Sequence, residues 1–372
     1  MDEALPERAR AAVAEGPGTT RLRDLPLPRP GADEGLLRVE ATGVCPTDWE
    51  RYLRGCGGVI LGHETVGRVT ALGERAAARW GVAVGDRIAV EEFLPCGTCR
   101  PCRRGDYRLC RAAGDGGGTP HPGYGRTPVA SRPGLYGGFS DYLYLHPRSV
   151  VHPVGDTVDP RAATLFAPLS SGIRWVVRQA RLRAGDTVVV LGTGRQGLGC
   201  VLAAHEAGAG TVIAVGPAAR WQHLHLAKHL GAAHVVFRDE EAAVDGVREL
   251  TGGRGADIVV HLTPEPGTVA EAVAMAADRA TVVLAAPDEG RIPACLPEDF
   301  PYDTVVRREL RMVGAHGHDH RSVEPALDII RSGRYPLHLL TTHHFPVAET
   351  DLALRTVAGH SGEHALHVSV GA

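Results

Sequence analysis

Two patterns of apolar and polar positions divide the chain. Up to about residue 150, short β-type runs are broken by Gly and Pro, which predicts a β-rich domain. Its expected strands are Leu36–Val39, Val66–Ala71, Arg87–Glu91 and Phe139–Leu145. From Asp186, short apolar runs alternate with Ala-rich helical stretches, a pattern typical of βαβ units and a parallel sheet. The expected strands of that sheet are Thr187–Leu191, Thr211–Val215, His234–Val236, Asp257–Val260 and Thr281–Ala285.

The alternation fades after Pro293. Beyond it we expect short strands at Met312–Gly314 and Leu366–Val370 and an amphipathic helix at Val323–Ser332, in a segment that returns to the first domain. The expected ranges are therefore 1–154 and 301–372 for the β-rich domain and 155–300 for the parallel-sheet domain. The glycine-rich stretch Gly114–Gly138 is expected to be a long surface loop.

Composition excludes several classes of function. The 372 residues are 44% hydrophobic and 22% charged, with a formal net charge of −3, which argues against a nucleic-acid or membrane-surface partner. No apolar run approaches the length of a membrane span, and the charged, Ala-rich N-terminus does not resemble a signal peptide. We therefore expect a cytoplasmic protein that acts on small molecules.

Four cysteines form the most distinctive motif. Cys96, Cys99, Cys102 and Cys110 have the spacing C-x2-C-x2-C-x7-C within residues 91–112, and four thiolates on one short loop can enclose a structural zinc ion. Arginines in the same stretch lower the thiol pKa values and offset the charge of a tetrathiolate. Disulfides are the alternative, but no secretory segment precedes the loop and the other cysteines are scattered.

A glycine-rich turn predicts a dinucleotide site. Gly192, Gly194 and Gly197 form G-x-G-x-x-G between an expected strand and an expected helix, and Arg195 and Gln196 fill the intervening positions. The glycines allow a tight turn, close approach of a pyrophosphate and close packing of helix on strand. The alternative is a glycine-rich corner without a ligand, but the repeated βα context favours a nicotinamide cofactor.

The end of the next strand bears on the choice of cofactor. NAD-binding units carry a carboxylate there for the ribose 2′-OH, whereas this chain has Gly216. Arg220 follows four residues later and could pair with a 2′-phosphate, which favours NADP. The alternative is that Arg220 is a solvated helix residue and that NAD binds without the acid.

Two upstream motifs complete a family pattern. Two segments of the chain resemble the catalytic-zinc motifs of the medium-chain, zinc-dependent alcohol dehydrogenase family. They are Gly43-Val44-Cys45-Pro46-Thr47-Asp48 and Gly62-His63-Glu64. With the four-cysteine lobe and the glycine-rich turn, the resemblance spans nearly the whole chain. It implies an α/β protein with a GroES-like catalytic domain split around a Rossmann domain, and hydride transfer between a nicotinamide cofactor and a secondary alcohol or ketone. It also implies a homodimer or homotetramer.

The resemblance assigns roles to particular residues. Cys45 and His63 would bind a catalytic zinc, and Asp48 would orient the His63 imidazole. Thr47 would pass the substrate proton onward. Glu50 stands where many members carry a relay histidine and could do the same work.

The third zinc ligand is missing from its family position. The Cys or Glu of the family falls here on Ala167, which cannot coordinate a metal. Glu64 could complete the shell, Cys56 is a more remote substitute, and an empty catalytic site is the third possibility. Without that metal, the chain would be a zinc-free NADPH-dependent C=C or C=N reductase, or a non-catalytic nucleotide-binding protein.

Overall fold

The fold divides into two compact units. A computed structural model describes residues 5–110, 123–238, 243–265, 267–285, 300–362 and 364–372. Unit 1 comprises Met1–Phe166 and Leu327–Ala372, and unit 2 comprises Ala167–Ala326. None of the described helices combines the length and the hydropathy that crossing a bilayer requires.

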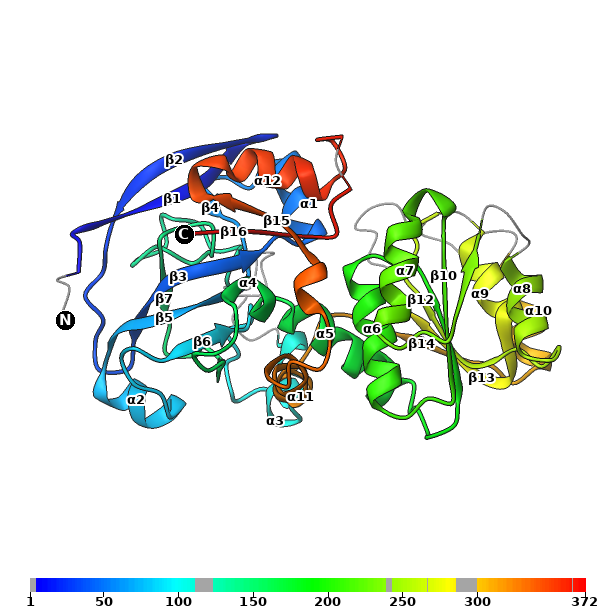
Figure 1. Ribbon diagram of the computed structural model, residues 1–372. Helices are drawn as coiled ribbons and strands as arrows, with labels where there is room; N and C mark the ends of the chain where they lie inside the picture. Colours follow the sequence, from blue (N-terminus) through cyan, green and yellow to red (C-terminus); the bar gives the residue numbers. More distant parts are fainter. Residues whose placement is uncertain (1–4, 111–122, 239–242, 266, 286–299, 363) are drawn as a thin grey trace. The chain divides into compact units, whose positions relative to one another are not determined.

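Unit 1 is built on two β-sheets (Figure 1). The three-stranded sheet has the order β2-β1-β4, with strands β1 (Arg8–Gly16), β2 (Thr19–Pro26) and β4 (Val59–Ile60). The larger sheet has the order β15-β16-β3-β5-β6-β8, and β7 also pairs with β3. Its strands are β3 (Gly35–Gly43), β5 (Glu64–Leu72), β6 (Arg87–Val90), β7 (Tyr142–Leu145), β8 (Val151–Pro153), β15 (Thr341–Pro346) and β16 (His367–Gly371).

Short helices connect and cover these sheets. They are α1 (Pro46–Arg54), α2 (Glu74–Trp80), α3 (Arg100–Arg103), α4 (Pro160–Ala163) and α12 (Thr350–Val357), with single turns η1 (Tyr107–Leu109), η4 (Leu337–Leu339) and η5 (Val347–Glu349). Inward-facing residues of both sheets, such as Val13, Leu37, Ile88 and Val368, form one continuous core. Burying such side chains contributes about 1.5–3 kcal/mol each.

Part of the glycine-rich stretch belongs to this core. Residues 111–122 lie outside the described residues, so the expectation of a surface loop is untested there. For residues 123–127 and 134–138 the expectation was wrong, because residues such as Tyr124, Leu135 and Tyr136 are buried in the core, whereas residues 128–133 between them are mostly exposed, as expected. The Tyr124 hydroxyl donates to the Tyr144 carbonyl at 2.9 Å. Glycine content predicted exposure, but here it allows the chain to approach other backbone segments closely.

Unit 2 is a six-stranded parallel sheet of order β11-β10-β9-β12-β13-β14. This is the doubly wound order, which places a ligand crevice at the carboxyl ends of the central strands. The strands are β9 (Thr187–Leu191), β10 (Thr211–Gly216), β11 (His234–Phe237), β12 (Ala256–His261), β13 (Ala276–Leu284) and β14 (Arg311–Gly314). Helices α6 (Arg195–Glu206) and α7 (Trp221–His229) cover one face, and α8 (Ala243–Leu250) and α9 (Thr268–Met275) cover the other (Figure 1).

The assignment of Met312–Gly314 to the returning segment was wrong. The strand β14 instead pairs in parallel with β13, with Val282 opposite Met312, and extends the nucleotide-binding sheet. A short apolar run carries no mark of the sheet it joins, so the sequence pattern could not decide this. The return to unit 1 occurs within α11 (His320–Arg331), which includes most of the expected amphipathic helix.

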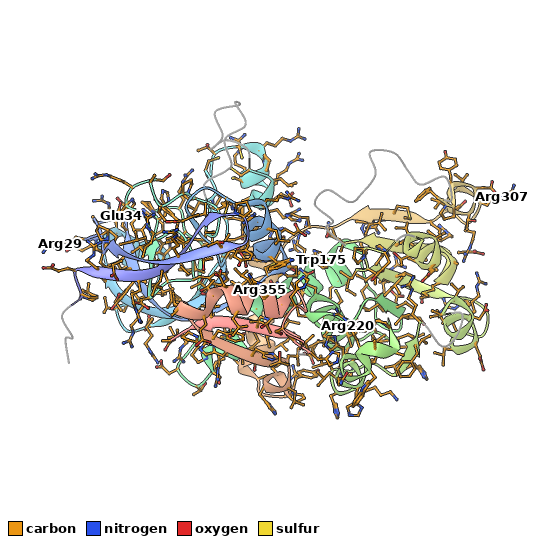
Figure 2. The ribbon with its side chains drawn as sticks, turned by 90° about the horizontal axis from the view of Figure 1, so that it is seen from above. Arg29, Glu34, Trp175, Arg220, Arg307 and Arg355 are labelled. Carbon is orange, nitrogen blue, oxygen red and sulfur yellow. The ribbon has the colours of Figure 1, made fainter. Side chains whose placement is uncertain are left out.

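The other described helical segments of unit 2 include α5 (Phe166–Gly172), a π-helix at Ile173–Gln179, the single turn at Ala218–Arg220 and α10 (Tyr302–Arg307). The π-helix carries Arg174, whose guanidinium lies 3.5 Å from the buried carboxylate of Asp319. Trp175, labelled in Figure 2, donates its indole N–H to the Gly317 carbonyl at 3.0 Å. These bonds fix the loop that precedes α11.

Candidate active site

Strand pairing brings together, in unit 1, three side chains of types that can bind a metal. Strands β3 and β5 are antiparallel, and Gly43 lies opposite Glu64. Cys45 follows β3 by two residues and His63 immediately precedes β5. One ligand atom of each of Cys45, His63 and Glu64 therefore lies within 4.8 Å of the others, and all three residues are buried. Sulfur, imidazole nitrogen and carboxylate oxygen form a donor set that suits Zn²⁺.

A glycine makes room for the Glu64 carboxylate. A Cβ atom at Gly43 would lie 2.4 Å from Glu64 Oε2, closer than such atoms approach in proteins. Any larger residue at position 43 would displace the carboxylate from its place beside Cys45 and His63. Cys56, the other candidate for the third ligand, does not belong to this group of the described residues. The geometry therefore favours Glu64 over Cys56.

Asp48 supports the cluster from behind. Its carboxylate is fully buried and accepts hydrogen bonds from the backbone N–H groups of Cys45 at 3.0 Å and Gly62 at 3.1 Å. Asp48 Oδ1 also lies 3.2 Å from His63 Nδ1. A proton on Nδ1 leaves Nε2 as the atom with a lone pair for a metal. Burial alone would raise the pKa of Asp48, but attraction to His63 and the hydrogen bonds with His63 and the Cys45 N–H lower it below its usual value.

The other metal-binding group is the four-cysteine lobe. The sulfur atoms of Cys96, Cys99, Cys102 and Cys110 lie within 4.8 Å of one another. Cys96 Sγ and Cys102 Sγ are 3.8 Å apart, too far for a disulfide. Four sulfurs placed tetrahedrally about 2.3 Å from one zinc ion would be about 3.8 Å apart. Hydrogen bonds from the Thr98 hydroxyl and from the backbone N–H groups of Cys99 and Thr98 lower the pKa of Cys96 to about 5, which favours the thiolate that zinc binds.

The glycine-rich turn of unit 2 has the geometry that a dinucleotide requires. Leu191 pairs with Val215 and with His261, so the loops after β9, β10 and β12 leave the sheet at one edge. Gly192 has a φ of +113°, and a Cβ atom at Gly197 would lie 1.9 Å from the Gly192 carbonyl oxygen. Helix α6 begins at this edge, where the N–H groups of its first turn can bind phosphate.

Two buried hydroxyls also lie in these loops. Among the described residues, Thr193 Oγ1 and Thr263 Oγ1 have no hydrogen-bond partner. Thr193 follows β9 between two glycines, and Thr263 follows β12. Both residues are at least nine-tenths buried. Because buried polar atoms are normally hydrogen-bonded, these hydroxyls fit a site for a polar ligand such as a dinucleotide.

Comparisons with known proteins agree with this geometry. Residues 31–156 match the model of the alcohol dehydrogenase GroES-like domain, and residues 197–332 match that of the zinc-binding dehydrogenases. A probable alcohol dehydrogenase of Mycobacterium tuberculosis is 42% identical over 94% of both chains. The erythritol/L-threitol dehydrogenase of Mycolicibacterium smegmatis is 32% identical, over 100% of this chain and 99% of the relative.

The chain belongs to the zinc-dependent medium-chain dehydrogenase/reductase family. A solved structure from Sinorhizobium meliloti, described as a zinc-binding dehydrogenase bound to NADP, has a TM-score of 0.81. It is 26% identical and covers 99% of this chain and 100% of that one. The fold and the resemblance expected from the sequence are thus confirmed. This dehydrogenase is an oxidoreductase that transfers hydride between an alcohol and NAD or NADP, and it has a structural zinc.

The remaining predicted residues of this dehydrogenase occupy varied environments. Thr47 and Glu50 are half-buried on α1, the helix that begins after Cys45. Gly216 ends β10, and Arg220, labelled in Figure 2, is exposed at the end of the single turn η3 (Ala218–Arg220), directly before α7. Ala167 is buried in α5. Its carbonyl oxygen accepts hydrogen bonds from the hydroxyls of Ser170 and Ser171, each with an oxygen–oxygen distance of 3.0 Å. Its methyl group cannot bind a metal.

Sequence reasoning missed two features of the site. Thr193 stands between the glycines of the turn, but its type gave no signal that its hydroxyl would be buried without a partner. The Tyr107 hydroxyl in the zinc lobe donates to Glu91 Oε2 at 2.5 Å, and His152 Nε2 lies 2.8 Å from Glu91 Oε1. The sequence offered two signals for this contact: Glu91 is an acid at the end of an expected strand, and Tyr107 lies between two cysteines of the lobe. Their contact depends on the tertiary fold.

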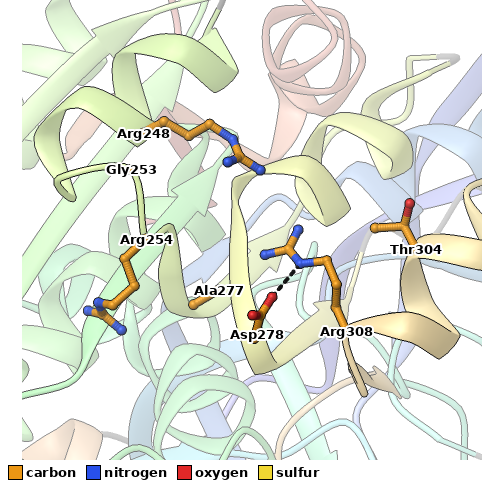
Figure 3. Close-up of a pocket in the computed structure, with 7 residues that line it drawn as sticks. All are labelled: Arg248, Gly253, Arg254, Ala277, Asp278, Thr304 and Arg308. Atoms are coloured by element: carbon orange, nitrogen blue, oxygen red, sulfur yellow. Dashed lines mark hydrogen bonds and ion pairs between the residues drawn. The ribbon is translucent and has the colours of Figure 1, made fainter.

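A separate hollow of about 680 Å³ lies at the amino ends of β12 and β13 (Figure 3). Three arginines line it, but Arg254 Nη1 lies 2.6 Å from Asp257, and Arg308 Nε lies 2.7 Å from Asp278. Arg248 donates to the Ala274 carbonyl at 3.0 Å. The hollow is at the opposite edge of the sheet from the glycine-rich turn. It is therefore separate from the dinucleotide site, and its arginines serve contacts within the fold.

Proposed function

We propose that this dehydrogenase interconverts a secondary alcohol and its ketone at a catalytic zinc held by Cys45, His63 and Glu64. The observation that carries the proposal is that one donor atom from each of three buried residues lies within 4.8 Å of the others. A buried carboxylate beside a thiol and an imidazole is costly unless it is compensated, and a divalent cation would compensate it.

The residues around the cluster support this chemistry. A bound zinc supplies a Lewis acid that lowers the pKa of the alcohol. Asp48 holds the His63 ring in the tautomer that presents Nε2 to the metal. Thr47, on the first turn of α1, is proposed to accept the alcohol proton and to pass it toward solvent, with Glu50 as the next group in the relay.

For the substrate, we propose a small polyol or a related vicinal diol. The support is the erythritol/L-threitol dehydrogenase, which is 32% identical over its whole length. For the cofactor we propose NADP, because Gly216 stands in place of an acid and Arg220 follows it. For the assembly we propose a homodimer or homotetramer, as the family resemblance implies.

Ala167 favours a second candidate. If Glu64 does not bind the metal, the chain has only two protein ligands for a catalytic zinc. The protein would then be a zinc-free NADPH-dependent reductase of C=C or C=N bonds, with hydroxyl donors such as Thr47 polarising the substrate.

Elemental analysis together with turnover separates these candidates. We expect two zinc ions per chain in the wild type, and one in Glu64→Gln, which keeps the structural site. Polyol oxidation by this variant should fall by roughly 100-fold or more, because the amide is a poor zinc ligand. Glu74→Gln, on the exposed start of α2, is the matched control and should keep both ions. Two zinc ions and full activity in Glu64→Gln would remove Glu64 from the site, whereas one zinc in an active wild type would favour the reductase.

A further inference from the structure

Thr193 and Gly216 are in close contact at the carboxyl edge of the parallel sheet. A Cβ atom at Gly216 would lie 2.6 Å from Thr193 Oγ1 and 3.2 Å from its methyl carbon. Because real Cβ atoms do not come within 3.0 Å of such neighbours, position 216 cannot carry a side chain while Thr193 keeps its rotamer. The hydroxyl therefore lies directly over the end of β10.

This place is significant for the cofactor. In dinucleotide-binding sheets, the residue at the end of the second strand meets the 2′ position of the adenosine ribose. A carboxylate there accepts a hydrogen bond from a 2′-OH and repels a 2′-phosphate. Here a neutral hydroxyl lies beside that position, and the chain from Gly216 to Trp221 contains Arg220 but no acid.

The Thr193 hydroxyl also lacks a bond that a cofactor could supply. Thr193 is 3% exposed, and its Oγ1 has no hydrogen-bond partner among the described residues. The neighbouring Arg238 does not fill this role, because its side chain forms two 2.9 Å bonds to Glu271. A phosphate oxygen on the ribose would accept the hydroxyl hydrogen, and such bonds to charged acceptors are stronger than neutral ones.

We propose that Thr193 sets the cofactor preference of this dehydrogenase by two effects. It excludes a side chain, and hence a carboxylate, from position 216, and it donates its hydroxyl to the 2′-phosphate of NADP. The inference rests on the proposed function only in requiring that a nicotinamide cofactor binds at the glycine-rich turn. It requires neither the catalytic zinc nor the polyol.

Calorimetry with cofactor fragments tests the second effect, the hydrogen bond from the Thr193 hydroxyl to the 2′-phosphate. Adenosine 2′,5′-bisphosphate and AMP differ only at the 2′ position, and binding of each is measured to the full chain. In Thr193→Val, which keeps the bulk over Gly216 but removes the hydroxyl, we expect the bisphosphate to bind roughly tenfold more weakly and AMP to change less than twofold. Thr193→Ser keeps the hydroxyl and should resemble the wild type. Equal losses for both fragments would overturn the proposal, because Thr193 would then only hold the loop.

A second pair of variants tests the exclusion of a side chain. Gly216→Asp alone should unfold at a lower temperature than the wild type, because its Cβ has no space. Adding Thr193→Ala should restore the midpoint and reverse the preference, so that AMP binds more tightly than the bisphosphate. Equal midpoints for the single and double variants would overturn the proposal. If neither fragment, NADPH nor NADH binds the wild type, the proposed function itself fails, whereas binding that is insensitive to Thr193 removes only this inference.

Discussion

At the scale of single residues, Asp48 links the backbone to the proposed zinc ligands. One carboxylate accepts hydrogen bonds from two backbone N–H groups, of Cys45 and Gly62, and faces the His63 ring. Cys45 and the turn before His63 are therefore held by the same two oxygen atoms. An error in the Asp48 position would misplace two of the three proposed ligands at once.

We predict that Asp48→Asn weakens catalytic zinc binding by roughly 10- to 100-fold, because an amide cannot accept from both N–H groups and hold the same His63 tautomer. Zinc affinity measured by competition with a chelator checks this. Asp86→Asn is the control, because Asp86 also accepts a backbone N–H, that of Ala83 at 2.8 Å, but on the surface. An unchanged affinity in Asp48→Asn would mean that Asp48 serves the fold alone.

At the scale of elements, the zinc lobe is attached to the sheet through buried polar contacts. The Tyr107 hydroxyl on η1 donates a hydrogen bond to Glu91, the residue after β6. The ring Nε2 of His152 on β8 lies 2.8 Å from the other carboxylate oxygen of Glu91. Glu91 is fully buried, so its carboxylate oxygens need hydrogen-bond partners within the fold. The lobe is thereby fixed to two adjacent strands as well as by the ion that its cysteines bind.

We predict that Tyr107→Phe destabilises the protein by about 1–3 kcal/mol, since Glu91 loses one partner while remaining buried. Chemical denaturation monitored by circular dichroism measures this loss, and zinc content should stay at the wild-type value. Tyr302→Phe, at an exposed position, is the matched control. Loss of zinc at unchanged stability would show instead that Tyr107 acts on the metal site.

Sequence pattern predicted the elements better than their partners. The strands of the parallel sheet were found because each is an apolar run beside a helical stretch, and Thr187–Leu191 has the expected bounds. Met312–Gly314 was assigned to the wrong unit, because pairing is decided by neighbours distant in sequence. The same limit applies to the site. The motifs predicted Cys45 and His63, but only the pairing of Gly43 with Glu64 shows how the carboxylate reaches them.

At the scale of the whole molecule, each unit contains a histidine that the fold keeps neutral. Burial and the nearby Arg148 lower the pKa of His146 in unit 1 to about 4, and its Nδ1 accepts the Arg148 N–H at 3.0 Å. Burial lowers the pKa of His261 in unit 2 to about 4 as well. In the unfolded chain both should titrate near 6.5.

We predict that stability falls as the pH decreases from about 6.5 to about 4. In this window the unfolded chain binds protons that the folded chain does not. The free energy of unfolding therefore becomes smaller as the pH is lowered. The drop in melting temperature between pH 7 and pH 4.5 should be smaller in His261→Gln by about 2 °C or more. His338→Gln, at an exposed position, should show the wild-type drop. An unchanged drop in His261→Gln would contradict the prediction.

The position of β16 has a consequence for synthesis on the ribosome. This strand lies between β15 and β3 in the larger sheet of unit 1, although its residues follow those of β3 by more than 300 positions. The segment 167–326 is continuous and can fold as soon as it leaves the exit tunnel. The earlier segment must wait until residues 367–371 emerge, with β3 uncovered at residues 41–43, where β16 pairs with it. Nascent chains are therefore exposed to misassembly through the first part of the protein to be made.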